Sequence, residues 1–164
     1  MTAQTARIKL NLPSNGDIHT MPESIDPKRL KLTNEAGTEG VLLGLRCREC
    51  GVAVFGSGTF CQSCTSDKLE AIEFGQRGTL YSYTVVRVPP AGWPGPVPYI
   101  LGQVELPEGP QVLAEVVETP VEDLNIGMEV ELVLRAAGGG PESDKSGKMV
   151  YKWRPAPNDL STAG

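Results

Sequence analysis

Four cysteines, grouped as two CxxC pairs, constrain this chain more than any other feature of its sequence. Cys47 and Cys50 form the first pair, Cys61 and Cys64 form the second, and ten residues separate the pairs. A CxxC turn brings two thiolates to one side of a cation, so two such turns supply the four sulfurs of a tetrahedral zinc site. The sequence therefore predicts one Zn²⁺ ion with these four ligands, and no cysteine is left over to act as a nucleophile.

Two other uses of the cysteines stay open. Iron in a rubredoxin-like tetrathiolate would take the same four ligands, and a CxxC pair can also act as a redox dithiol. Disulfides are less favoured, because CxxC pairs without a targeting signal are typical of metal sites in a reducing compartment. Four cysteines close the ligand shell of zinc, so we expect a structural rather than a catalytic metal.

Short apolar runs flank the first pair. Residues 41–46 indicate a strand that leads to Cys47, and residues 52–55 indicate a strand that leaves after a turn at Gly51. We expect a positive φ at Gly51, which turns backbone N–H groups toward the sulfurs; Thr65 holds the equivalent place after the second pair. A ribbon of about twenty residues buries too little surface to fold alone, so the metal is expected to stabilise it.

The chain from residue 72 onward predicts five short strands with one helical turn before the fourth. The strands are expected at residues 79–88, 99–106, 111–118, 128–134 and 148–154, and the turn at 123–127. This order suits a five-stranded Greek-key barrel of the OB type better than a sandwich.

The expected protein is mainly β and has four parts. They are an extended N-terminal arm (1–40), a rubredoxin-like zinc ribbon (41–71), a five-stranded OB-fold domain (72–155) and a disordered tail (156–164). The arm is assigned because its prolines and polar residues show little hydrophobic periodicity, although Asp26 and Pro27 can cap one helical turn.

Charge and hydropathy exclude two classes of partner. The net charge is −5, and the expected second and third barrel strands offer Gln103, Glu105, Leu113 and Glu115 where OB folds present aromatic residues to bases. Carboxylates oppose phosphates, so nucleic acid is not expected. No apolar run reaches the length of about 18 residues that a membrane span needs, and no signal peptide is visible, so a soluble cytoplasmic protein is expected.

No nucleophile with a base, acid–base pair or phosphate-binding glycine loop is recognisable, so the chain is not expected to be an enzyme by itself. The Pro-rich segment 89–98 carries Trp93 and is flanked by Arg87 and Tyr99. Trp93 is either a core plug or an anchor for a protein partner or an apolar substrate. Arg87 and Tyr99 are either ordinary surface residues or contacts for a phosphate or a carbonyl.

The motifs, taken in this order, resemble the zinc-ribbon plus OB-fold proteins of acyl-CoA metabolism, which are small companions of thiolase-like subunits. The likeness covers about two thirds of the chain, residues 45–153. It rests on the knuckle at residues 46–51, the second cysteine pair, and the segments 78–86, 98–99, 104–109 and 126–130. The family usually has an amphipathic helix before the ribbon, where this chain has its Pro-interrupted arm.

The resemblance implies a noncatalytic zinc-binding subunit of a heteromeric thiolase-like complex that acts on a β-ketoacyl-CoA. It implies two copies of each subunit, with the acyltransferase chemistry and its residues on the partner. This chain would stabilise the partner and help close its acyl-CoA pocket, with Trp93 and Tyr99 reaching the CoA thioester. The alternative is a stand-alone OB-fold module that binds CoA thioesters or single-stranded nucleic acid.

Overall fold

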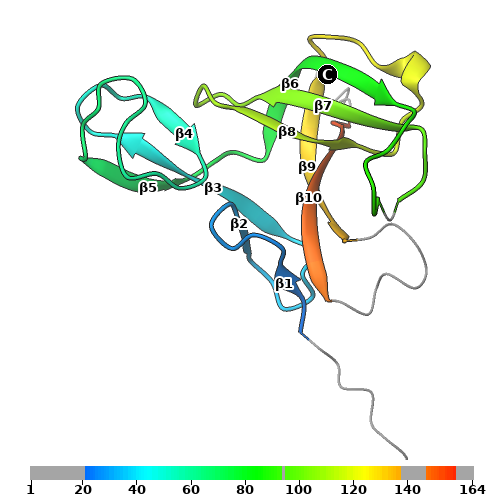
Figure 1. Ribbon diagram of the computed structural model, residues 1–164, viewed down its shortest axis with the longest axis horizontal. Helices are drawn as coiled ribbons and strands as arrows, with labels where there is room; N and C mark the ends of the chain where they lie inside the picture. The colour runs from blue at the N-terminus through cyan, green and yellow to red at the C-terminus, as the bar shows by residue number, and fades with distance from the viewer. Residues whose placement is uncertain (1–20, 94, 138–146, 158–164) are drawn as a thin grey trace, which may run out of the picture.

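The computed structural model describes residues 21–93, 95–137 and 147–157 (Figure 1). These residues form ten strands and a single-turn 3₁₀ helix, and no helix among them is long and apolar enough to cross a membrane. The first half of the expected arm lies outside the described residues. The same is true of most of the expected tail.

Five strands close into a barrel on the right of Figure 1. They are β6 (Arg77–Val86), β7 (Tyr99–Glu105), β8 (Gln111–Val116), β9 (Glu129–Ala136) and β10 (Lys148–Pro155). β6 pairs antiparallel with β7 and β9, and β7 pairs antiparallel with β8. β10 pairs antiparallel with β9 and parallel with β8, which closes the ring. The short helix η1 (Val121–Asp123) precedes β9, so the expected OB-type barrel is confirmed.

Inward-facing side chains, which alternate with outward-facing ones along each strand, fill the barrel. Ile100, Val104, Val112 and Ala114 are buried as expected, and each is separated from the next buried residue of its strand by one outward residue. Trp153 on β10 is the largest fully buried side chain. Burying an aromatic ring of this size contributes several kcal/mol, so the last strand is essential to the barrel.

A second sheet is built around the long strand β3 (Gly40–Cys47). β2 (Leu30–Leu32) and β4 (Ala53–Phe55) pair with successive parts of one edge of β3, and β5 (Leu69–Glu73) pairs with the other edge. β3, β4 and β5 form the lobe at the left of Figure 1. The sequence predicted β3 and β4 but not β5.

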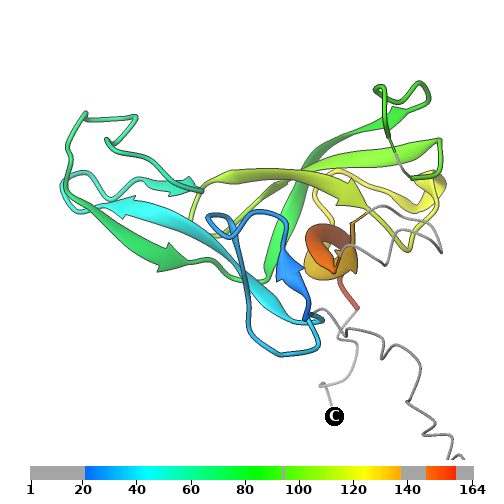
Figure 2. The ribbon, with the colours of Figure 1, turned by 60° about the horizontal axis from the view of Figure 1, so that its bottom comes forward.

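Two short strands form in residues 21–40, the described part of the segment expected to be an extended arm. β1 (Glu23–Ser24) pairs parallel with the start of β10, and Leu30 at the start of β2 is fully buried. Figure 2 shows this segment beside the barrel. The turn between the two strands is capped as proposed, because the Asp26 carboxylate accepts the Lys28 N–H at 3.0 Å. Strands of two and three residues leave no periodic pattern, so only tertiary pairing reveals them.

The ribbon sheet and the barrel share one hydrophobic core. Leu30 and Leu42 from the ribbon sheet and Phe74 after β5 are buried in the same cluster as the barrel residues. The Phe74 ring lies directly over Gly44, where a Cβ atom would come within 2.4 Å of the ring. Glycine is therefore required at residue 44 for the ribbon to meet the barrel.

Candidate functional site

Two similar backbone turns position the cysteines. The Gly51 N–H donates to the Cys47 carbonyl at 2.9 Å, and the Thr65 N–H donates to the Cys61 carbonyl at 2.9 Å. The expected positive φ at Gly51 is confirmed, at 77°, and Thr65 adopts a φ of 61°. A left-handed conformation in a β-branched residue costs on the order of 1 kcal/mol, so the second turn is held under strain by its surroundings.

The two turns bring four sulfurs together. All four Sγ atoms lie within 4.8 Å of one another, and the Cys47–Cys64 and Cys50–Cys61 pairs are each 3.5 Å apart. Four ligands at 2.3 Å from a tetrahedral zinc ion lie about 3.8 Å from one another. A disulfide bond needs a distance of about 2.05 Å between its two sulfurs, and all four cysteines are free. The cluster therefore fits a single metal ion with four sulfur ligands.

The electrostatics of the cluster favour a bound cation. Backbone N–H groups of Cys64 and Ser63 lower the pKa of Cys61 to about 6. A hydrogen bond from the Ser66 backbone lowers the pKa of Cys64, but the sulfur of Cys50 and other neighbours raise it to about 12. Thiolates this close oppose one another's ionisation, and a divalent cation removes that repulsion.

Among the residues that the structure describes, no other ligand type joins the cluster. Within the described ranges, only the four cysteines form a group that can hold a metal ion. Charged residues of the ribbon form exposed ion pairs, Arg48 with Glu70 at 3.0 Å and Lys68 with Glu49. An all-sulfur shell has no open coordination position, so this centre is suited to holding a fold together rather than to activating water.

The Pro-rich loop brings two of its three predicted residues together. The Trp93 and Tyr99 rings stack, with centroids 4.2 Å apart and planes at 16°. The indole N–H of Trp93 donates to the Pro96 carbonyl at 3.3 Å. Trp93 is half-buried beside the outer surface of the barrel, so it is not a plug of the core. Arg87 is exposed at the start of the loop and does not line the same hollow.

A hollow of about 350 Å³ lies beside the stacked rings. Its lining includes Leu101 of β7 and Tyr151 of β10, so most of its surface is apolar. Glu115 of β8 and Lys152 of β10 form an ion pair in its floor, and each side chain is only 16% exposed. The hollow can accept an uncharged apolar group, because its two charges neutralise each other.

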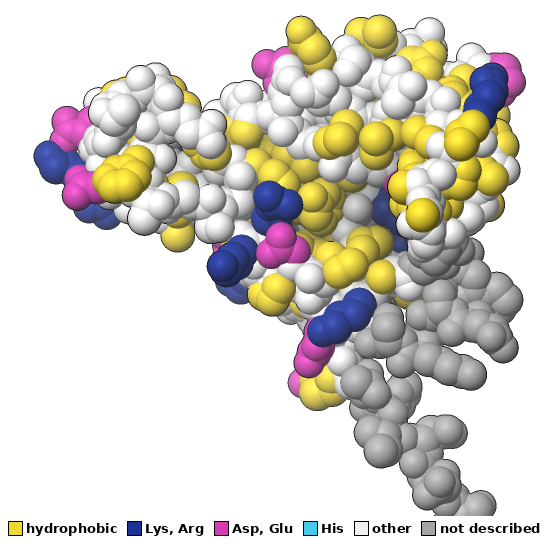
Figure 3. Space-filling model, viewed as in Figure 1, with side chains coloured by type: hydrophobic (Ala, Val, Ile, Leu, Met, Phe, Trp, Pro, Cys, Tyr) yellow, Lys and Arg dark blue, Asp and Glu magenta, His cyan; other side chains and the backbone are white. Residues whose placement is uncertain are grey.

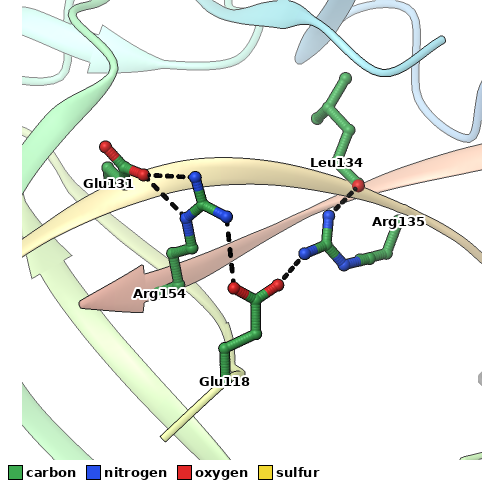
Figure 4. Close-up of polar contacts among 5 residues, drawn as sticks. All are labelled: Glu118, Glu131, Leu134, Arg135 and Arg154. Atoms are coloured by element: carbon green, nitrogen blue, oxygen red, sulfur yellow. Dashed lines mark hydrogen bonds and ion pairs between the residues drawn. The ribbon is translucent and has the colours of Figure 1, made fainter. Parts of the chain in front are cut away.

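Sequence reasoning missed a network of charges on the outside of β9 and β10. Arg154 donates through Nε to Glu131 at 2.7 Å and through a terminal nitrogen to Glu118 at 3.2 Å (Figure 4). Arg135 donates to the second oxygen of Glu118. Arg154 lies directly opposite Glu131 in the β9–β10 register, so the pairing becomes visible only once that register is known.

Comparison with known proteins identifies the family. The family model described as the C-terminal OB-fold domain of ChsH2 matches residues 71–135. A DUF35 domain-containing scaffold protein of Methanocaldococcus jannaschii is 34% identical over 71% of this chain and 83% of its own length. Its counterpart in Pyrococcus furiosus is 38% identical over 70% of this chain and 82% of its own length. This chain belongs to the DUF35 family.

Two further similar proteins extend the comparison. The benzoylsuccinyl-CoA thiolase subunit BbsA of Geobacter metallireducens is 32% identical over 66% of this chain and 70% of its own length. The solved Ltp2-ChsH2(DUF35) aldolase is 29% identical, has a TM-score of 0.59, and covers 71% of this chain and 86% of that chain. The resemblance to OB-fold companion proteins with a four-cysteine ribbon is confirmed.

Proposed function

We propose that this DUF35 protein is a noncatalytic, zinc-binding subunit that docks on a thiolase-like catalytic chain acting on a β-ketoacyl-CoA. The observation that carries the proposal is its 32% identity to BbsA, a protein named as a thiolase subunit, over 66% of this chain. In this assembly the small subunit stabilises its partner and helps close the partner's acyl-CoA pocket. The nucleophile and the acid–base groups belong to the partner.

Zinc is the metal we assign to Cys47, Cys50, Cys61 and Cys64. The 3.5 Å spacing of the paired sulfurs and the all-sulfur donor set support this assignment. When bound, the ion supplies a crosslink between the two CxxC turns. The backbone of each turn orients two thiolates, and the sheet around β3 holds the turns together. Because the site needs free thiols, we place the protein in the cytoplasm.

The three loop residues are proposed as contacts to the partner or its substrate. The stacked rings of Trp93 and Tyr99 offer a rigid aromatic edge, which is the kind of group that anchors protein interfaces. We propose that this edge reaches the mouth of the partner's acyl-CoA pocket. Arg87 is exposed at the start of the same loop, and its guanidinium suits a phosphate or a carbonyl.

The apolar hollow favours a second candidate function, a stand-alone module that binds the acyl part of a CoA thioester. The same hollow does not favour nucleic acid, because Glu115 and Lys152 are the charged residues that line it and together they offer no net positive charge to a phosphate. We also propose that the zinc ribbon spans residues 41–71 and the OB-fold domain spans residues 72–155.

Co-expression with the thiolase-like chain of the same organism tests the proposed function. We expect one complex with two copies of each chain on size exclusion, with thiolysis of a β-ketoacyl-CoA that depends on the partner's cysteine. Separate elution of the two chains contradicts the proposal. So does thioester turnover by the isolated small chain, and saturable acyl-CoA binding by that chain without any complex supports the second candidate.

A further inference from the structure

The outer face of β7 and β8 carries two hollows joined by an exposed leucine. Gln111, Leu113 and Glu115 alternate with buried residues along β8, so their side chains lie on one face. Gln111 lines a hollow against the ribbon, and Glu115 lines the hollow beside Trp93. Four residues of a strand span about 13 Å, so the positions on β8 that line the two hollows, Gln111 and Glu115, are about 13 Å apart.

The hollow against the ribbon is formed by β4 and the turn that follows β7. Val54 and Phe55 contribute from β4, Val52 precedes them, and Pro110 lies opposite. Its volume is about 460 Å³. Figure 3 shows hydrophobic side chains gathered in the recess between the ribbon lobe and the barrel. Leu113, which is 56% exposed, stands between this hollow and the one beside Trp93.

The polar groups of this face are satisfied by one another. The Gln103 amide donates to Gln111 at 2.6 Å and accepts from the Ser82 hydroxyl at 3.2 Å. Glu115 and Lys152 are the only charged residues among those that line the two hollows, and they pair with each other. The chain has a net charge of −5, whereas the linings of the two hollows carry no net charge; on the rest of this face, Glu105 lies opposite Gln111 at the end of β7 and adds one exposed carboxylate. The hollows therefore complement uncharged apolar groups rather than a phosphate.

We propose that this face, from Val52 on the ribbon to Trp93 on the barrel, is where the catalytic subunit docks. The occupant is one segment of that subunit, which places two uncharged apolar side chains about 13 Å apart into the two hollows and packs between them on Leu113. A helix covers this distance in about nine residues. The inference rests on the proposed function, and it specifies which surface of this chain makes the contact.

Two exposed aliphatic residues provide a matched test. Leu113→Arg places a charge between the hollows, whereas Ile126→Arg places one at a 68% exposed position before β9 that belongs to neither hollow. Each full-length variant is titrated against the purified thiolase-like chain. We expect Leu113→Arg to weaken the complex at least about tenfold and Ile126→Arg to leave it unchanged. Leu113→Gln, which is milder for the fold, should weaken it in the same direction.

Equal affinities for Leu113→Arg and the unmodified chain overturn the inference, as does an equal loss with Ile126→Arg. If the unmodified chain forms no complex, the proposed function itself has failed, which is a different result. If Leu113→Arg abolishes acetyl-CoA binding by the isolated chain but leaves the complex intact, the face is a ligand site and the docking inference is overturned. Metal content and thermal midpoint of each variant establish that it is folded.

Discussion

Phe55 of the ribbon and Tyr151 of the barrel meet edge to face, with ring centroids 5.8 Å apart and planes at 83°. Phe55 also packs against Phe74, and the Arg29 guanidinium lies 5.7 Å from its ring centroid. This contact joins the strand next to the four-cysteine cluster with the last strand of the barrel. The ribbon that carries the four cysteines is therefore packed directly against a strand that lines the hollow beside Trp93.

Replacing Phe55 should weaken this joint. Phe55→Ala removes a half-buried ring with two aromatic neighbours, so we expect a loss of about 2–3 kcal/mol in the free energy of unfolding. Urea unfolding followed by tryptophan fluorescence measures this loss. Phe60→Ala is the control, because Phe60 is 63% exposed and its loss should cost less than about 0.5 kcal/mol. Equal costs for the two variants would show that the ring contact is not a structural joint.

Alkaline pH should act on the same contact. Burial raises the pKa of Tyr151 above its ordinary value of 10.0. Its neutral form is thus favoured in the folded state, and the associated stability is present below pH 10 and is lost as the pH rises through the folded-state pKa. Thermal midpoints between pH 9 and 11 should fall more steeply for the unmodified protein than for Tyr151→Phe, which keeps the ring. Parallel curves would contradict this prediction.

Gly44 should tolerate no side chain. A Cβ atom there would lie 2.3 Å from the Val54 carbonyl oxygen and 2.4 Å from the Phe74 ring. We expect Gly44→Ala to destabilise the fold by about 1–3 kcal/mol, because both neighbours must move. Gly58→Ala is the matched control, since its nearest contact would be 3.8 Å. Chemical denaturation of both variants measures the loss of stability. An unchanged denaturation midpoint for Gly44→Ala would contradict the close packing of Phe74 on Gly44.

The metal centre is tested by removing one ligand. Cys50→Ser should lose the bound ion and lower the thermal midpoint, because three remaining thiolates hold zinc less firmly and the ribbon buries too little surface alone. Elemental analysis should find one zinc per unmodified chain and far less in the variant, with Ser57→Ala as control. Iron in the purified protein, visible by its absorption, would correct the metal, and a full equivalent of zinc in Cys50→Ser would remove Cys50 from the ligand set.

Trp93 should matter for the assembly rather than for the fold. Trp93→Ala leaves the barrel core intact but removes the partner of the Tyr99 stack. We expect either the affinity of the complex or its thiolysis rate to fall by about tenfold, as for an aromatic interface anchor. The control is Val88→Ala, at an 85% exposed residue of the same connection. If neither quantity changes in Trp93→Ala, the loop does not reach the acyl-CoA pocket.

Local patterns were sufficient to predict much of this protein. The CxxC spacing predicts the two turns because each turn is made by neighbouring residues, and the positive φ of Gly51 follows from the same short-range geometry. Alternation predicts the barrel strands because side chains point to opposite faces at every second residue, as Ile100, Gly102 and Val104 illustrate.

Tertiary structure alone decided the rest, because it depends on which distant segments meet. Leu30 is buried in a three-residue strand that pairs with β3, and the surrounding sequence has no hydrophobic periodicity that predicts this burial. The stack of Trp93 on Tyr99 follows from the path of a Pro-rich loop that has no repeating pattern, and so does the absence of Arg87 from the hollow that these rings line. Leu113 lies between two hollows because the ribbon is fixed beside the barrel, an arrangement that strand periodicity does not encode.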